Sequence, residues 1–433
     1  MASKIPEDML RELVLTPDET LMMVDEAERV IAEALAINEL FLASSRVLPK
    51  SEWKLVKSRE KVQVFRKRKE KSLYCGGMRS SNSSEEKRSP LSSFGRARSD
   101  TSETTSVSSI PFVRTSVENQ HSSNSASSVS SGFDGGSEMN ARKPATTPFI
   151  IATGIIAGTI EDVAFGNLAY TERLTRYRDT HMHDEFAATK ILATIISPTT
   201  EDPFQSLVIK WNTKREGPLS RNRDCVFIEA NGIAISASGE RVAYHLKHSI
   251  DNIPRIPGFK HLDIVRVNAS MCSISRQYDQ SSVEVFCRGY ADLGGNITEG
   301  AATSKYTDML LSMIHVVDCA YMKKLIWLTR VKREANLKAA VSNLGSKPAR
   351  HCDNCAASLS ILGNLIHTGT ACQACQQEIC SKCSVSKKLT IEVSSSEMKS
   401  KTVTFCLHCV IEAKQIPTRQ VAVTIMTMRS QAL

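Results

Sequence analysis

The sequence predicts an α+β domain followed by a small cysteine-rich module. Between about residues 148 and 334, short helices at residues 160–185 come first, alternating strands follow, and one long helix at about residues 301–333 comes last. An order in which helices and strands are segregated is typical of antiparallel α+β domains. In addition, eight of the thirteen cysteines lie in the last ninety of the 433 residues.

The N-terminal segment predicts one amphipathic helix. Residues Thr16-Pro-Asp-Glu19 have the form of a capping box, with a proline at the first helical position. Apolar residues then recur at helical spacing, so we expect a helix from about Pro17 to Ala43. We assign residues 1–48 to this unit and expect its helix to pack on the following domain.

Two different segments precede the main domain. Residues 52–71 alternate apolar and basic side chains, which predicts a hairpin with one face in water. Between residues 78 and 146, 21 of 69 residues are serine and only three are aromatic. Such a composition buries too little apolar surface to offset the entropy of ordering the chain. We therefore expect residues 78–146 to form a disordered, serine-rich insertion.

Five segments with alternating apolar and polar residues predict the strands of the main domain. They are Leu207–Trp211, Cys225–Ala230, Arg241–Lys247, Ile264–Tyr278 and Val283–Tyr290. Together with the hairpin and the long closing helix, they give a domain over residues 50–335 that the serine-rich insertion interrupts.

This region resembles the START family of lipid-transfer domains. The resemblance rests on Pro218-Leu-Ser-Arg-Asn-Arg223-Asp224, which is similar to the family's turn into a strand but has one extra residue, and on Trp53 and the helix that Gly158-Thr-Ile-Glu-Asp-Val begins. It implies a START-like helix-grip fold, in which a curved antiparallel sheet wraps a long C-terminal helix and leaves a tunnel for a hydrophobic lipid ligand. The alternative is a filled core without a ligand.

The cysteine-rich module predicts two metal centres. Its cysteines form four Cys-x-x-Cys pairs: Cys352 and Cys355, Cys372 and Cys375, Cys380 and Cys383, Cys406 and Cys409. Two residues between thiolates let both sulfurs reach one ion about 2.3 Å away, and two such pairs make a closed tetrahedral zinc site. Eight cysteines therefore fit two structural Zn²⁺ ions with no open position for a substrate. Disulfides are the alternative, but five further unpaired cysteines favour a reducing compartment.

The same module, residues 344–415, resembles the FYVE zinc finger. The spacing of all eight cysteines is similar to that of the family, and the run from Cys372 to Cys383 follows its central motif. The resemblance implies cross-braced metals, one bound by the first and third pairs and the other by the second and fourth pairs. Residues 416–433 are left as a C-terminal tail, and we expect the finger and the START-like domain to unfold independently.

The phosphoinositide-binding motif of FYVE fingers is degenerate here. Thr368-Gly-Thr-Ala-Cys372-Gln373 stands where the family has a basic motif, and Thr404 stands where it has an arginine. Without charge-assisted donors, headgroup recognition of the usual kind is not expected. The replacement candidates for a headgroup are Arg350, His351 and His367, and the candidates for membrane insertion are Ile361, Leu362, Leu365 and Ile366.

These features predict a non-enzymatic lipid-binding or membrane-adaptor protein. No phosphate-binding glycine loop or hydrolase motif is present, and His181, His183 and Asp184 are interpreted as solvated surface, not as an acid–base or metal site. The alternative is a zinc finger of the RING or PHD type that acts as a ubiquitin ligase or a protein-interaction module.

Charge and hydropathy limit the partners and the location. The net charge of +9 is spread along the chain, so we expect no nucleic-acid partner. Residues 1–20 are acidic and polar, and no apolar run approaches the ~20 residues that cross a membrane. We expect a cytoplasmic protein that docks on phosphoinositide-containing or endosomal membranes, or on a protein partner, through its finger.

Overall fold

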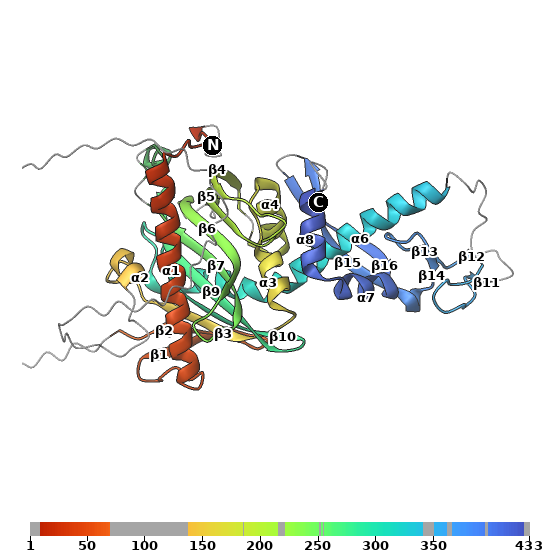
Figure 1. Ribbon diagram of the computed structural model, residues 1–433, viewed down its shortest axis with the longest axis horizontal. Helices are drawn as coiled ribbons and strands as arrows, with labels where there is room; N and C mark the ends of the chain where they lie inside the picture. The colour runs from red at the N-terminus through yellow and green to blue at the C-terminus, as the bar shows by residue number, and fades with distance from the viewer. Residues whose placement is uncertain are drawn as a thin grey trace, which may run out of the picture.

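The computed structural model describes residues 9–69, 137–184, 186–214, 221–250, 253, 255–340, 350–361, 366–394 and 397–427. Figure 1 shows a sheet with helices on both sides, from which one long helix runs into a smaller lobe. We call the sheet with the helices that pack on it the cavity domain, and residues 350–415 the finger. Within the described residues, no helix is both long and apolar enough to cross a membrane.

The cavity domain is built on one large antiparallel sheet. Its strands in the described residues are β1 (Trp53–Arg59), β2 (Val62–Lys67), β3 (Ile150–Ala157), β4 (Ala188–Ile196), β5 (Ser206–Lys214), β6 (Arg223–Ile235), β7 (Arg241–Ser249), β8 (Val265–Arg266), β9 (Asn268–Asp279) and β10 (Ser282–Asp292). They lie in the order β1-β2-β3-β10-β9-β7-β6-β5-β4, and β8 pairs with β6 off this path. The predicted hairpin and the predicted α+β fold class are both confirmed.

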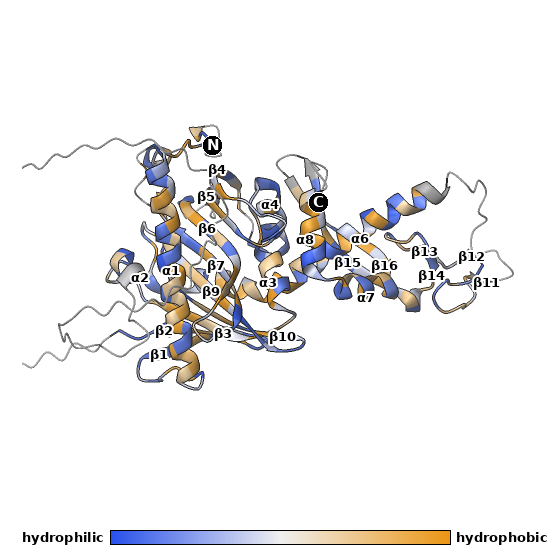
Figure 2. Cartoon of the chain, viewed as in Figure 1, coloured by the Kyte–Doolittle hydropathy of each residue, from blue (hydrophilic) through white to orange (hydrophobic). Residues whose placement is uncertain are grey.

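One face of the sheet is covered by the N-terminal helix α1 (Pro17–Ala43). Thr16 and Glu19 form the predicted capping box, and the helix ends where the sequence predicts. Residues such as Val30, Ile37 and Phe41 are buried against the apolar face of β5, β6, β7 and β9. Figure 2 shows apolar and polar residues alternating along α1, which is the pattern of a helix with one buried side.

The other face of the sheet is covered by helices from three parts of the chain. They are α3 (Ile160–Asn167), α4 (Glu172–His181), and the helical segment made of α5 (Glu299–Leu311), the 3₁₀ turn η3 (Ser312–His315) and α6 (Val316–Ala340). The sequence predicts a single helix at residues 301–333, whereas the structure interrupts it at η3. Ser312 begins this turn and donates a hydrogen bond through its hydroxyl to the Met309 carbonyl, which is the local competition that tightens a helical turn.

Three segments differ from the sequence prediction. Strands β3 and β4 are absent from the predicted set, and β3 is apolar on both sides because Ile150 and Ile151 are buried in different cores. Most of the predicted disordered insertion lies outside the described residues, but its end forms helix α2 (Ser137–Arg142), in which Met139 is fully buried. The predicted tail contains helix α8 (Thr418–Thr427).

The finger consists of short hairpins and one helix. Its described elements are β11 (Ser360–Ile361), β12 (Ile366–His367), β13 (Thr370–Ala371), β14 (Glu378–Ile379), η4 (Ser381–Cys383), β15 (Ser384–Ser394), β16 (Glu397–Cys406) and α7 (Leu407–Gln415). Its core includes Met322, Leu325 and Leu328 of α6 beside Phe405 and Val410. Helix α6 therefore contributes to both parts of the molecule.

Helix α8 returns from the finger to the cavity domain. Val421 and Ala422 are buried in the core that also contains α3. The hydroxyl of Thr418 donates to Asp162 of α3 at 2.6 Å, and Lys324 of α6 lies 3.3 Å from the same carboxylate. Figure 1 shows α8 beside α6, between the sheet and the finger. This packing argues against independent unfolding of the two parts.

Candidate ligand cavity and metal centres

A cavity of about 430 Å³ lies between helix α5 and the face of the sheet that α3 to α6 cover. Strands β5, β6, β7, β9 and β10 form its floor, and α5 with η3 forms its roof. The segment between α4 and β4 adds His183, Asp184 and Phe186. The predicted tunnel position, between the sheet and the helix that closes it, is therefore hollow in this chain.

The walls of the cavity contain both apolar and charged side chains. The apolar side chains come from different elements and include Phe186, Phe227, Val267, Met271, Ala291, Leu293 and Met309. Asn212, Lys247 and Ser270 introduce polar atoms from the sheet. Pockets for small molecules have this composition, in which apolar walls hold the body of the ligand and a few polar groups orient it.

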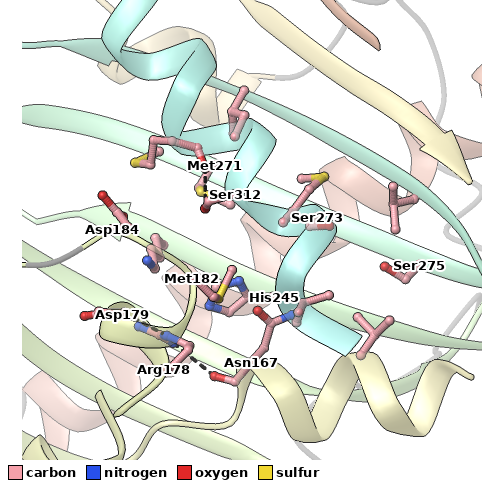
Figure 3. A pocket seen from close by; sticks show the side chains of 17 residues that line it. Asn167, Arg178, Asp179, Met182, Asp184, His245, Met271, Ser273, Ser275 and Ser312 are labelled. Carbon is pink, nitrogen blue, oxygen red and sulfur yellow. Dashed lines mark hydrogen bonds and ion pairs between the residues drawn. The ribbon is translucent and has the colours of Figure 1, made fainter. Parts of the chain in front are cut away.

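A narrow extension of about 40 Å³ continues beneath α4 and η3. It shares Asp184, Lys247, Met271, Met309 and Ser312 with the larger cavity and is lined further by Asn167, Arg178, Asp179 and His245. Figure 3 shows Arg178 and Asp179 on one side of this extension, with His245 and Asn167 beside them. The inner end of the cavity is therefore polar.

The polar end is organised by Glu229 on β6. Arg178 of α4 donates to Glu229 at 2.5 Å, His245 of β7 lies 2.8 Å from the same oxygen, and Lys210 of β5 forms an ion pair with the other oxygen. Arg178 also pairs with Asp179 at 3.0 Å. All five side chains are buried, so this is a charged network inside the domain.

Burial and charge together set the pKa values of this network. Burial alone would raise the pKa of Glu229, but Arg178 and Lys210 hold it well below its ordinary value. Burial lowers the pKa of His245 to about 4 and that of Lys210 to about 8. At neutral pH the network therefore contains a carboxylate, two cations and a neutral imidazole, with Asp179 beside them.

The sequence interprets His181, His183 and Asp184 as solvated surface, which is wrong for Asp184, because it is buried. His181 lies 3.1 Å from Asp318, and the ring centroids of His183 and His315 are 5.8 Å apart. Asp184 pairs with Lys214 at 3.1 Å and lines the cavity. Within the described residues, the groups that could hold a metal consist of cysteines, so these histidines form no such site.

The eight cysteines of the finger lie in two groups of four. One contains Cys352, Cys355, Cys380 and Cys383, and the other contains Cys372, Cys375, Cys406 and Cys409. In each group all the sulfur atoms lie within 4.8 Å of one another. This is the cross-braced grouping that the resemblance implies, because each group joins pairs that are separated by another pair in the sequence.

The geometry of both groups fits a tetrahedral ion. Sulfurs about 2.3 Å from one metal lie about 3.8 Å apart, and the distances are 3.6 Å from Cys355 to Cys380 and 3.9 Å from Cys375 to Cys406. Backbone amides of Cys406 and Cys409 donate to sulfurs of the second group at 3.2 and 3.3 Å. Four thiolates this close repel one another unless a cation lies between them. The two groups could therefore bind two metal ions.

The pKa values of the second group show the same crowding. A hydrogen bond with Cys409 lowers the pKa of Cys372 to about 4, while that interaction raises the pKa of Cys409. The thiolate of Cys372 therefore keeps the thiol of Cys409 protonated. A cation among the four sulfurs would remove this conflict, because thiolates are the form that binds metal.

The candidate membrane-contact residues of the finger are only partly described. Arg350 and His351 are exposed beside the first cysteine pair. Ile361 pairs with Ile366 across β11 and β12, and His367 follows in β12, whereas Leu362 and Leu365 lie outside the described residues. These candidates stay predictions.

The positions at which the FYVE resemblance would place basic residues face another part of the chain. Thr370, Ala371, Gln373 and Thr404 line a groove of about 630 Å³ whose other wall comes from α4 and α6. Arg173 of α4 pairs with Glu392 of β15 at 2.8 Å across this region. The surface that lacks basic residues therefore faces a groove beside the cavity domain and one ion pair across it.

Comparisons with known proteins describe the fold only. No family model and no curated protein matches the sequence. The structure is similar to human STARD10 at 10% identity and a TM-score of 0.34, covering 64% of this chain and 77% of that one. It is also similar to human StAR-related lipid transfer protein 5, at 12% identity and a TM-score of 0.35. This match covers 70% of this chain and 98% of that one.

A bacterial protein gives the same picture. The STAR-related lipid transfer protein from Xanthomonas axonopodis, as a fragment of residues 25–204, is 12% identical with a TM-score of 0.32, covering 61% of this chain and 96% of that one. At this level of similarity, none of these proteins carries an inference about the ligand of this chain.

Sequence reasoning misses the charged residues of the cavity. Lys210, Glu229, His245 and Lys247 each alternate with apolar neighbours in a strand, a pattern that equally fits a face in water. Their number could have revealed them, since three neighbouring strands carry a charged residue or a histidine at their centres. Only the helices that cover this face show that it is an interior surface.

Proposed function

We propose that this chain is a non-enzymatic protein that binds a hydrophobic, lipid-type ligand in the cavity beneath α5. The observation that carries the proposal is the cavity of about 430 Å³ with apolar walls at the position where a helix-grip fold holds its ligand. Its size falls within the range of about 300–1,000 Å³ typical of small-molecule sites. Its charged groups are mostly paired with one another, as expected of a binding site and not of a reacting one.

The finger has a structural role in this proposal. Two zinc ions would each be held by one group of four cysteines, and they would supply the charge that allows the thiolates to lie together. All four positions of each ion are taken by sulfur, so the ions perform no chemistry on a substrate. The cross-braced sulfur groups support a FYVE-like finger.

Ligand binding is tested by native mass spectrometry of the full chain after incubation with a mixed lipid extract. We expect one lipid per chain, since the cavity is a single space. The matched variant is Ala269→Trp, which places a large side chain on the cavity floor and should abolish the lipid adduct while the melting temperature changes little. Failure to bind any lipid, or equal binding by the variant, would contradict the proposal.

The second part of the proposal is that the finger docks the protein on cytoplasmic, endosomal membranes. The exposed Arg350 and His351 support it, because they offer positive charge beside the first cysteine pair. The test is sedimentation of the full chain with vesicles that contain or lack phosphatidylinositol 3-phosphate, alongside an Arg350→Ala, His351→Ala variant. Binding that needs the lipid and both residues supports docking, and equal recovery with both vesicle types refutes it.

A further inference from the structure

The polar end of the cavity has more positive than negative charge. In the described residues, Arg178, Asp179 and Lys247 line this end, and Arg178 joins it to the buried network with Lys210 and Glu229, so three cations stand against two carboxylates. His245 adds no charge, because burial lowers its pKa to about 4. One positive charge at this end therefore has no carboxylate of its own.

Lys247 carries the uncompensated charge. It is half-buried, and it lines both the main cavity and its narrow extension. Glu229 lies directly opposite it on β6, but Arg178, Lys210 and His245 already occupy that carboxylate. Within the described part of the chain, the ammonium group of Lys247 has no hydrogen bond or ion pair.

The other carboxylates of the cavity wall are occupied as well. Asp184 pairs with Lys214, and Asp308 pairs with Lys57. Asp224 accepts two hydrogen bonds from Arg266, at 2.9 and 2.8 Å, and one from the Trp211 ring nitrogen. Each described carboxylate that lines the cavity has another partner within hydrogen-bond distance, and Lys247 acts on Asp179 and Glu229 only through its charge.

We propose that the ligand is an amphipathic molecule with an anionic head group, which Lys247 binds at the polar end of the cavity. This inference rests on the proposed lipid-binding function and names the class of ligand. A carboxylate or phosphate on the ligand would complete the charge balance at Lys247. Its apolar body would lie against the walls formed by side chains such as Phe186, Phe227 and Leu293. A charged hydrogen bond inside a cavity is stronger than one in water.

The test uses three ligands with the same chain and different heads. Dodecanoate, dodecyl phosphate and the neutral dodecanol are titrated into the full chain by calorimetry, below the concentrations at which they aggregate. We expect Lys247→Met to weaken both anionic ligands at least tenfold and to leave dodecanol unchanged. Lys247→Arg, which keeps the charge, should restore most of the affinity. If Lys247→Met weakens binding of only one of the two anionic ligands, the head group of that ligand, carboxylate or phosphate, is the one that Lys247 binds.

Two controls make the result specific. Lys260 in the 3₁₀ turn at residues 260–262 is exposed and does not line the cavity, so Lys260→Met should change none of the affinities. Equal losses in both lysine variants would overturn the role of Lys247. Thermal unfolding of each variant verifies that the fold is retained before the affinities are compared.

The outcomes separate this inference from the function on which it rests. If dodecanol and the anions all bind, and Lys247→Met changes none of them, the cavity binds apolar chains but does not recognise an anionic head. If none of the three ligands binds the unmodified chain while its fold is intact, the proposed lipid-binding function fails, and the inference fails with it.

Discussion

The cavity domain and the finger are stabilised by different interactions. The cavity domain buries apolar residues on both faces of a ten-stranded sheet, and its cores contain residues from the N-terminal helix to α8. The finger has a small core in which cysteines stand beside a few apolar residues. A domain with a sheet of this size buries enough apolar surface to stay stable around a cavity. A small module with little apolar surface needs another source of stability, such as a bound metal ion.

The two regions nevertheless share their boundary. Helix α6 begins over the sheet, runs through the core of the finger, and ends at Ala340. Lys332 of this helix lies 3.4 Å from the sulfur of Cys409, and Asn336 donates to the carbonyl of Cys375 at 2.9 Å. The comparison therefore teaches that one helix, α6, packs in the core of the finger and continues from the α5–η3 segment that covers the cavity.

The largest expected effect comes from removing one zinc ligand. Cys372→Ser should lower the zinc content and unfold the finger, because the free energy of metal binding is folding free energy, about 10 kcal/mol or more in isolated fingers. Since α6 and α8 connect the regions, we also expect the melting temperature of the cavity domain to fall. Calorimetry combined with zinc analysis measures both effects.

Two other cysteine variants sharpen this test. Cys380→Ser affects the metal group formed by the first and third pairs, so we expect a smaller shift of the cavity domain than for Cys372→Ser. Cys225 lies outside the finger, beside Ser249, and Cys225→Ser should retain two zinc ions per chain. If the melting temperature of the cavity domain is unchanged in Cys372→Ser, the two regions unfold independently, as the sequence predicts.

The second prediction concerns the contact between α3, α6 and α8. Asp162 is buried and accepts from Thr418 at 2.6 Å, with Lys324 at 3.3 Å. Asp162→Ala leaves the buried ammonium of Lys324 without this carboxylate, and such changes cost about 3–5 kcal/mol. Chemical denaturation should show this loss.

The matched control is an exposed ion pair of the same domain. Lys57 and Asp308 are 43% and 49% exposed, so Asp308→Ala should cost less than about 1 kcal/mol. Similar losses for both aspartates would mean that the buried contact does not connect the two regions.

The sequence predicts the two regions to different extents. Cysteine spacing predicts the four pairs, because two intervening residues fix the geometry of a pair, and the resemblance to the FYVE finger implies which pairs share a group. The ends of α1 are equally predictable, since Thr16 and Pro17 mark its start by local hydrogen bonding. These are features that neighbouring residues determine.

Features that distant residues determine are not predictable in this way. Strand β3 is missed because Ile150 and Ile151 face different cores, so no alternation appears. The position of the cavity follows from the START resemblance, but its volume does not, because that volume depends on how the side chains of α5 and five strands fill the space between them. From the sequence alone Lys247 has the pattern of a surface lysine, because only the fold shows that helices cover this face of the sheet.

The third prediction concerns acid stability and acts only on the cavity domain. The pKa of His245 is lowered by burial to about 4, from about 6.5 in the unfolded chain. Between these values the unfolded state binds more protons, so the free energy of unfolding falls as the pH drops from about 6.5 to 4. The loss should be on the order of 2 kcal/mol.

Denaturation at several pH values measures this contribution. His245→Gln retains an amide that can donate to Glu229 but does not titrate, so the variant should show a flatter dependence between pH 6.5 and 4. Glu26 serves as the internal reference, because its pKa is lowered to about 2 by His248 and it acts at lower pH. An identical pH profile in the variant would show that His245 is not the group responsible.

The smallest expected effect tests whether the N-terminal helix belongs energetically to the cavity domain alone. Thr16 accepts a hydrogen bond from the amide of Glu19 at 3.2 Å, and Glu19 accepts one from the amide of Thr16 at 2.8 Å. Thr16→Ala removes the first bond and should destabilise the protein by about 1 kcal/mol, while Thr16→Ser retains it. Because α1 packs on the face of the sheet opposite α6, the zinc content and ligand affinity should not change. A loss of zinc from Thr16→Ala would mean that the coupling between the regions extends through the sheet and is not confined to α6 and α8.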